Sequence, residues 1–258
     1  MLEWADVLSI FSGAIVGLVL GLIGGGGSIL AVPLLLYLVG VTDPHVAIGT
    51  SAVAVSANAL LGLVGHARAK TVKWPCAATF AAAGIVGAWL GSSLGKTIDG
   101  QALLSFFALA MIAVGLNTLL VKRPEGAADV TITPAIAAKL VGFGGATGAA
   151  AGFFGIGGGF LIVPGLMAGS GMAMLNAVGS SLVSVFALGA TTAANYALSD
   201  LVDWRVAGLF VAGGILGSAA GLQGAKRLSQ KRGLLSLVFG WLVLFAGAYV
   251  LARSLLAV

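Results

Sequence analysis

Long apolar segments separated by short polar ones dominate the chain. They run over about 7–23, 28–39, 46–65, 74–94 and 101–120 and, after a polar linker at 121–133, over about 136–154, 159–170, 176–198, 204–222 and 234–251. Most are long enough to cross a hydrocarbon core of roughly 30 Å as α-helices. They lack the alternation of apolar and polar residues that barrel strands need. The pattern predicts an all-α polytopic membrane protein embedded in a lipid bilayer.

The pattern occurs twice. Residues 21–33 read GLIGGGGSILAVP and residues 152–164 read GFFGIGGGFLIVP. Other matches, such as Trp74 with Trp204, are also 130 or 131 positions apart. We therefore expect one transport domain over 1–258, made of repeat 1 (about 7–120), the linker (121–133) and repeat 2 (about 136–251).

The charged loops indicate how the two repeats are oriented. The loop at 68–73 is basic and its counterpart at 200–203 is acidic, whereas the mixed loop at 96–99 corresponds to a basic one at 226–232. Lysine and arginine accumulate in cytoplasmic loops, so equivalent loops are expected on opposite sides. This predicts inverted repeats, each with a Gly-broken helix hairpin, re-entrant or paired, and three transmembrane helices. Both termini would then be periplasmic in a multi-pass inner-membrane protein.

The glycine clusters are the candidate binding site. Glycines interrupt an apolar helix, and a duplicated interruption in a membrane protein indicates a transporter's substrate site. A half-helix that begins at Ser28 or Gly159 would present free amide N–H groups and a positive dipole end to an anion. We therefore expect a small anionic substrate to contact Gly24, Gly25, Gly26, Gly27, Ser28, Thr50, Ser51, Gly155, Gly157, Gly158, Gly159, Ser180 and Ser181. The alternatives are that the glycines serve close packing and that the hydroxyls bond backbone carbonyls.

Composition excludes several classes of protein. The 258 residues are 59% hydrophobic and 8% charged, against about 25% charged residues in soluble domains, and the mean hydropathy is +1.11. Cys76 is the only cysteine and there are two histidines, so we expect no disulfide within the chain, no metal and no cofactor. The net charge of +5 comes without a basic run interleaved with aromatic residues, so no nucleic acid is expected. Gly155–Gly159 lacks dinucleotide-fingerprint spacing, and no catalytic motif is found, so the chain is not expected to be an enzyme.

Small and polar residues within the apolar segments predict helix packing. Glycines recur on one helix face at Gly84, Gly87, Gly91 and Gly95, and again at Gly213, Gly217 and Gly221. Such faces permit close backbone approach, either between the two halves or between the subunits of a homodimer. Asn58 and Asn195 are isolated polar residues and are expected to bond neighbouring helices.

The doubled pattern resembles a known family. The turn at Gly24–Ser28 leading to Pro33, the following Ala47-Ile48-Gly49-Thr50-Ser51 and the second copy at Gly155–Pro164 with Gly179-Ser180-Ser181 are similar to the TauE/SafE family of sulfite exporters and sulfonate or thiosulfate permeases. The resemblance implies transport of small sulfur-containing or related organic anions across the inner membrane.

The resemblance also bears on the substrate. It implies several pathway cysteines in thiosulfate importers, and this chain has only Cys76. We therefore expect export of sulfite or a small organosulfonate by alternating access. The alternatives are a channel-like anion conduit, or an importer of thiosulfate or a small carboxylate.

Overall fold

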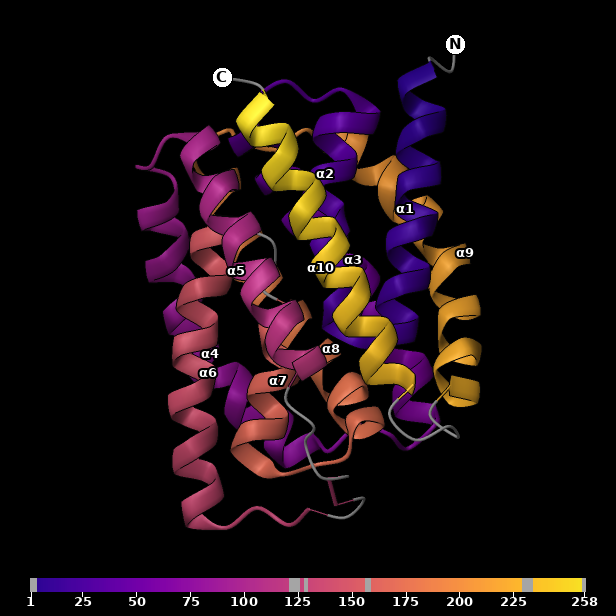
Figure 1. The fold of residues 1–258 in the computed structure, drawn as a ribbon, viewed down its shortest axis with the longest axis vertical. Coiled ribbons are helices and arrows are strands. Elements are labelled where there is room, and N and C mark those ends of the chain that lie inside the picture. Colours follow the sequence, from indigo (N-terminus) through magenta and orange to yellow (C-terminus); the bar gives the residue numbers. More distant parts are fainter. Residues whose placement is uncertain (1–3, 121–125, 128–129, 156–158, 229–233, 257–258) are drawn as a thin grey trace.

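The fold is a bundle of helices, as predicted for an all-α polytopic membrane protein (Figure 1). The computed structural model describes residues 4–120, 126–127, 130–155, 159–228 and 234–256, and no strand occurs among them. The helices, in chain order, are α1 (Trp4–Ile23), the 3₁₀ helix η1 (Gly24–Leu30), α2 (Ala31–Leu34), the π-helix η2 (Leu35–Val39), α3 (Pro44–Arg68), α4 (Trp74–Gly95), α5 (Gly100–Leu120), α6 (Pro134–Phe154), α7 (Gly159–Ser170), α8 (Met174–Ala197), α9 (Trp204–Leu228) and α10 (Leu234–Leu256).

Eight helical segments of the described chain are long and apolar enough to cross a membrane. α7 is shorter, with 12 residues and an internal Pro164. Its bounds are those predicted for the second short apolar segment. The structure therefore describes a multi-pass membrane protein.

Two helices start slightly earlier than the apolar pattern predicted. α3 begins at Pro44 because Asp43 accepts hydrogen bonds from the backbone N–H of His45 and Val46, at 2.7 and 3.4 Å. α6 begins at Pro134 after the cap Thr133. A polar cap followed by proline is a favoured helix start, since proline needs no N–H there.

The segment expected to be a half-helix from Ser28 differs from the prediction. The helical path resumes directly at Gly24 as the 3₁₀ helix η1 and continues through α2 and η2. Glycine has no Cβ and adopts tight turns at little steric cost. The glycine run therefore belongs to the first turns of the returning helix, and Ser28 lies within η1.

Glycines bring the outer helix pairs into backbone contact. α1 packs against α9 and α4 packs against α6. A Cβ on Gly17 would lie 2.7 Å from the Gly214 Cα, and a Cβ on Gly148 would lie 2.6 Å from the Gly84 Cα. The glycine faces expected to pack between halves or subunits thus pack between helices of one chain, in both cases one helix from each repeat.

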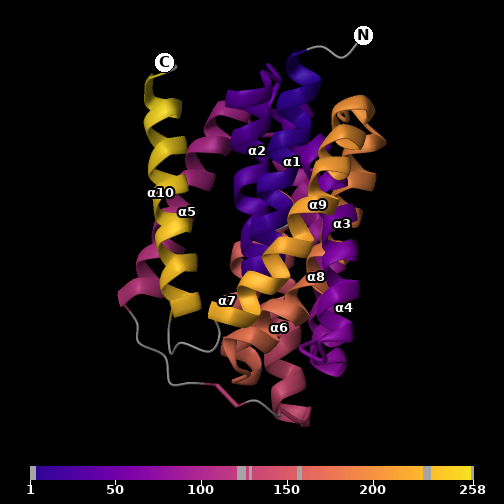
Figure 2. The same ribbon diagram turned by 90° about the vertical axis from the view of Figure 1, so that its right-hand side faces the viewer.

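The remaining long helices form two further pairs. α3 packs against α8 in the interior, and α5 packs against α10. Figure 2 shows α5 and α10 standing together beside the other helices. One of two clusters of described core residues lies around the α3 and α8 pair, which also carries Thr50, Ser51, Ser180 and Ser181, and the other includes residues of α5 and α10.

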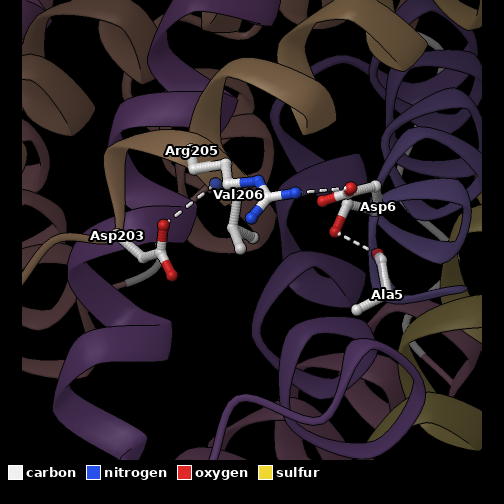
Figure 3. A network of polar contacts seen from close by, with 6 residues as sticks. Ala5, Asp6, Asp203, Arg205 and Val206 are labelled. Carbon is white, nitrogen blue, oxygen red and sulfur yellow. Dashed lines mark hydrogen bonds and ion pairs between the residues drawn. The ribbon is translucent and has the colours of Figure 1, made fainter. Parts of the chain in front are cut away.

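The two ends of the bundle differ in charge. α1 begins at the end that holds both termini, whereas α6 begins at the opposite end (Figure 1). Near the termini, Arg205 at the start of α9 pairs with the buried Asp6 carboxylate of α1 at 2.7 Å (Figure 3). At the opposite end the last turn of α1 contacts His66, and the basic residues Arg68 and Lys70 follow.

Candidate functional site

Both glycine clusters begin with a left-handed residue. Gly24 follows α1 with φ 67°, and Gly155 follows α6 with φ 68°. Gly40 and Gly171 form a second such pair (90° and 73°), and Lys70 and Asp200 a third (57° and 54°). Residues with a Cβ rarely adopt this backbone conformation. The repeat seen in the sequence is therefore also present in the backbone turns.

The two clusters meet each other. A Cβ on Gly159 would overlap the Gly25 carbonyl oxygen, and a Cβ on Gly25 would lie 2.7 Å from the Gly159 Cα. Gly26 faces the Phe239 ring, and Gly27 faces the backbone of α1 at Leu20. Gly157 and Gly158 lie outside the described residues. Predicted site residues from both repeats are thus adjacent.

Ser181 connects the second repeat to the first glycine turn. Its Oγ accepts a hydrogen bond from the Gly25 N–H at 2.9 Å and donates to the Val178 carbonyl at 2.8 Å. Ser28 donates to the Gly25 carbonyl at 2.8 Å. One backbone amide of the glycine turn is therefore held by a side-chain oxygen, the kind of acceptor that an anion would replace.

The remaining predicted hydroxyls also have backbone partners. Ser51 donates to the Ile48 carbonyl at 2.8 Å. Thr50 and Ser180 accept from the N–H groups of Asp203 and Lys73, at 2.9 and 2.8 Å. All three side chains are fully buried. In this conformation an anion could bind these hydroxyls only by replacing their present backbone partners.

A cavity of about 580 Å³ opens at the end of the bundle that holds the termini. Asp43 and Asp99 line it, together with His45 and Gln101. Two carboxylates repel an anion, so this cavity is a poorer anion site than the glycine turns. The described residues contain no group of three or more metal-ligating side chains.

The two isolated asparagines differ. Asn195 bonds α4 as predicted, donating to Ser92 Oγ at 2.6 Å and accepting from Lys96 Nζ at 2.7 Å. Asn58 is fully buried against Gly214, and among the described residues neither of its amide atoms has a hydrogen-bond partner. The prediction that Asn58 bonds a neighbouring helix is wrong for this conformation.

His66 is a buried polar residue that the sequence did not single out. It is fully buried at the end of α3 and contacts Gly21 and Thr71. His66 stands 130 residues before the buried Tyr196, which is the spacing of the two repeats. A comparison of equivalent positions in the two halves could therefore have drawn attention to it.

Comparison with known proteins shows the family of the chain. Residues 9–253 match the family described as Sulfite exporter TauE/SafE. A "Probable membrane transporter protein" of Xylella fastidiosa (strain 9a5c) is 51% identical over 256 residues, covering 96% of this chain and 95% of the relative. The "Probable membrane transporter protein YunE" of Bacillus subtilis (strain 168) is 27% identical over 246 residues, covering 87% and 90%. No solved structure matches the chain significantly. The chain is a multi-pass membrane transporter and belongs to the sulfite exporter TauE/SafE family.

Proposed function

We propose that the protein exports sulfite, or a small organosulfonate, across the inner membrane by alternating access between two inverted halves. The family description and the transporter relatives support this class of function. The single observation that carries the proposal is the meeting of the two glycine turns at Gly25 and Gly159.

Reciprocal contacts support the two-halves arrangement. Thr50 of the first half holds the N–H of Asp203 in the second, and Ser180 of the second holds the N–H of Lys73 in the first. α1 and α6 start at opposite ends of the bundle (Figure 1). Two halves that make the same contacts with exchanged roles can rock around a shared site, which is how inverted repeats alternate access.

The charge distribution supports periplasmic termini. Asp6 and Asp203 lie near the end that holds the termini, whereas Arg68 and Lys70 follow the end of α3 at the opposite side. Basic residues mark the cytoplasmic side. With this orientation, the membrane potential favours exit of an anion by about 2.3 kcal/mol per charge and 100 mV.

The site can hold an anion without a buried lysine or arginine. The amide N–H groups of the glycine turns and the hydroxyls of Ser51 and Ser181 are the donors that we assign to it. The backbone contact between Gly25 and Gly159 leaves no room for an anion between these two residues. A carrier needs the two halves to separate at such a contact during each cycle, whereas a conduit would need an opening there. The close contact therefore favours a carrier.

Counterflow in proteoliposomes tests the proposal. We expect saturable exchange of labelled sulfite that unlabelled sulfite or isethionate accelerates, with weaker effects of thiosulfate and acetate. Single-channel currents would instead identify a conduit. Absence of both currents and exchange in folded protein would reject a transport function.

A further inference from the structure

His66 is a titratable side chain that the proposed transport cycle leaves unused. Its imidazole is fully buried. Nε2 lies 3.2 Å from the Gly21 carbonyl oxygen, and Nδ1 lies 2.9 Å from the Thr71 hydroxyl. Thr71 Oγ1 also lies 3.1 Å from the backbone carbonyl oxygen of His66 itself.

The neutral imidazole satisfies these contacts. A carbonyl oxygen only accepts, so Nε2 carries a proton and donates it to Gly21. Nδ1 then accepts from the Thr71 hydroxyl. Each ring nitrogen has a partner of the correct kind.

The protonated imidazole satisfies the same contacts. A proton added at Nδ1 is donated to Thr71 Oγ1, and the hydroxyl hydrogen of Thr71 turns to the His66 carbonyl oxygen. Nε2 keeps its bond to Gly21. His66 can therefore gain or release one proton by rotation of a single hydroxyl group, without leaving a buried polar atom unpaired.

This network touches the first glycine pattern and the Gly179-Ser180-Ser181 segment of the second half. Gly21 lies in the last turn of α1, directly before the first glycine turn. In a continued α-helix the Gly25 N–H would donate to the Gly21 carbonyl, but Gly25 donates to Ser181. Thr71 lies against Gly179, so close that a Cβ there would be 2.5 Å from Thr71 Oγ1. Gly179 directly precedes Ser180.

We propose that His66 binds the proton that is cotransported with the anion, one proton per anion. The inference rests on the proposed transport function and adds the coupling ion to it. An imidazolium bonded to the Gly21 carbonyl places a positive charge beside the first glycine turn, where it attracts an anion. Proton and anion binding then favour each other, and by linkage the effect is reciprocal.

The charged residues on the surrounding elements strengthen this mutual dependence. Arg68 and Lys70 follow His66 in the chain, Lys73 precedes α4, and Lys226 and Arg227 stand in the sequence at the end of α9, which contacts α3. α8 carries no charged residue, and the described carboxylate of α1, Asp6, lies at the other end of that helix. A like charge nearby disfavours protonation of an imidazole, and a bound anion would offset that effect.

The second half supplies no equivalent proton site. The residue 130 positions after His66 is Tyr196, and Leu201 corresponds to Thr71. A phenol ordinarily titrates near pH 10 and stays neutral at physiological pH. A single imidazole therefore sets the ratio at one proton. With one proton, the sulfite dianion still leaves as one net negative charge, whereas a sulfonate would move without net charge, so export driven by the potential favours sulfite.

The test uses the full-length protein in liposomes with sulfite as the probe. Two quantities are measured, sulfite exchange at equal pH and the sulfite ratio reached across a pH gradient. In the wild type, one coupled proton makes this ratio change by about tenfold per pH unit beyond the contribution of sulfite's own titration, because one pH unit is a tenfold proton ratio. His66→Gln removes the positive charge that attracts the anion, so sulfite exchange at equal pH should be slower but still measurable, and the additional tenfold change should be lost. The pH response that remains in this variant comes from the protonation of sulfite itself, and the wild-type response is compared with it.

Matched variants separate coupling from folding. His45→Gln changes the other histidine and should behave as the wild type. Thr71→Ser keeps the hydroxyl and should keep coupling, whereas Thr71→Val should weaken it, and this pair carries the test if His66→Gln does not fold. Identical pH-gradient responses of the wild type and a folded His66→Gln would overturn the inference, as would loss of exchange in that variant. Absence of exchange in the wild type rejects the transport function itself, and this inference with it.

Discussion

Thr50 and Asp203 join the two halves of the chain: Thr50 Oγ1 accepts a hydrogen bond from the Asp203 backbone N–H at 2.9 Å. Asp203 in turn accepts from the Val206 N–H at 3.0 Å and caps α9, as Figure 3 shows. With the halves exchanged, Ser180 accepts from the Lys73 N–H at 2.8 Å, directly before α4. Each half therefore supplies the hydroxyl that fixes the start of a helix in the other.

Removing either hydroxyl should destabilise the protein. Thr50→Val or Ser180→Ala leaves a backbone N–H without its acceptor, which costs about 1–3 kcal/mol when the group is buried. Thr50→Ser keeps the acceptor and should melt near the wild type. Thermal unfolding in detergent measures the effect, and equal melting temperatures for Thr50→Val and Thr50→Ser would contradict it.

Ser51 and Ser181 should separate ligand binding from stability. Ser51 only donates to a carbonyl in its own helix, so we expect Ser51→Ala to lower stability by only about 1 kcal/mol. If its hydroxyl binds the anion, affinity for sulfite should fall about five- to a hundred-fold, since losing a partner costs roughly 1–3 kcal/mol.

Ser181→Ala should lower both quantities, because the Gly25 N–H also loses its partner. Calorimetric titration with sulfite and thermal unfolding measure the two effects. Unchanged sulfite affinity in both alanine variants would place the site on backbone amides alone.

A methyl group at Gly159 should block transport. Its Cβ would overlap the Gly25 carbonyl oxygen, and backbone atoms cannot move aside as a flexible side chain can. The matched control is Gly142→Ala on α6, where a Cβ would meet nothing within 4 Å. We expect sulfite exchange to be lost in Gly159→Ala and retained in Gly142→Ala. Normal exchange by Gly159→Ala would argue against a site between the glycine turns.

Replacing Gly26 by leucine is a milder test of the same site. A Cβ there would overlap the Phe239 ring, and that ring is a side chain that can move. Gly26→Leu should therefore reduce exchange while the protein still folds. Sulfite exchange and the melting temperature are measured together.

Helix positions and the repeat followed directly from the sequence, because apolar runs and their spacing are local properties. α7 has the bounds that its apolar run predicted, and the caps at Asp43 and Thr133 account for the earlier starts of α3 and α6. The start of the first short helix could not be predicted, because whether a glycine run ends a helix or forms a 3₁₀ turn depends on what it packs against. Here that neighbour is Gly159, more than a hundred residues away.

The hydrogen-bond partners of the candidate site residues could not be predicted from the sequence either. Sequence spacing singled out Thr50, Ser51, Ser180 and Ser181, but it could not show that each bonds a backbone group. Nor did composition single out His66, since two histidines in a chain carry no pattern. Its importance comes from burial and from two hydrogen-bond partners, a carbonyl acceptor and a hydroxyl that can donate or accept, which only the folded chain provides.

Asn58→Leu should stabilise the protein. The Asn58 amide is buried without a partner in the described structure and packs against Gly214. The residue 130 positions later is Leu188, which packs against Gly84 in the equivalent place. Burying an unpaired amide costs about 1–3 kcal/mol, and leucine would remove that cost. A higher melting temperature is expected, with Leu188→Ala as a destabilising control, and a lower one would mean that Asn58 has a partner in the native membrane.

Single cysteines should report the orientation of the two halves. Lys70 and Asp200 occupy equivalent exposed turns, both left-handed, 130 positions apart. Cys76 is buried, and replacing it by serine removes the only native thiol. In intact cells an impermeant maleimide should label Asp200→Cys and leave Lys70→Cys unlabelled, because basic turns face the cytoplasm. Permeabilised cells provide the control, since both cysteines should then react. Labelling of both positions, or of neither, in intact cells would place the two turns on the same side and exclude an inverted relationship between the halves.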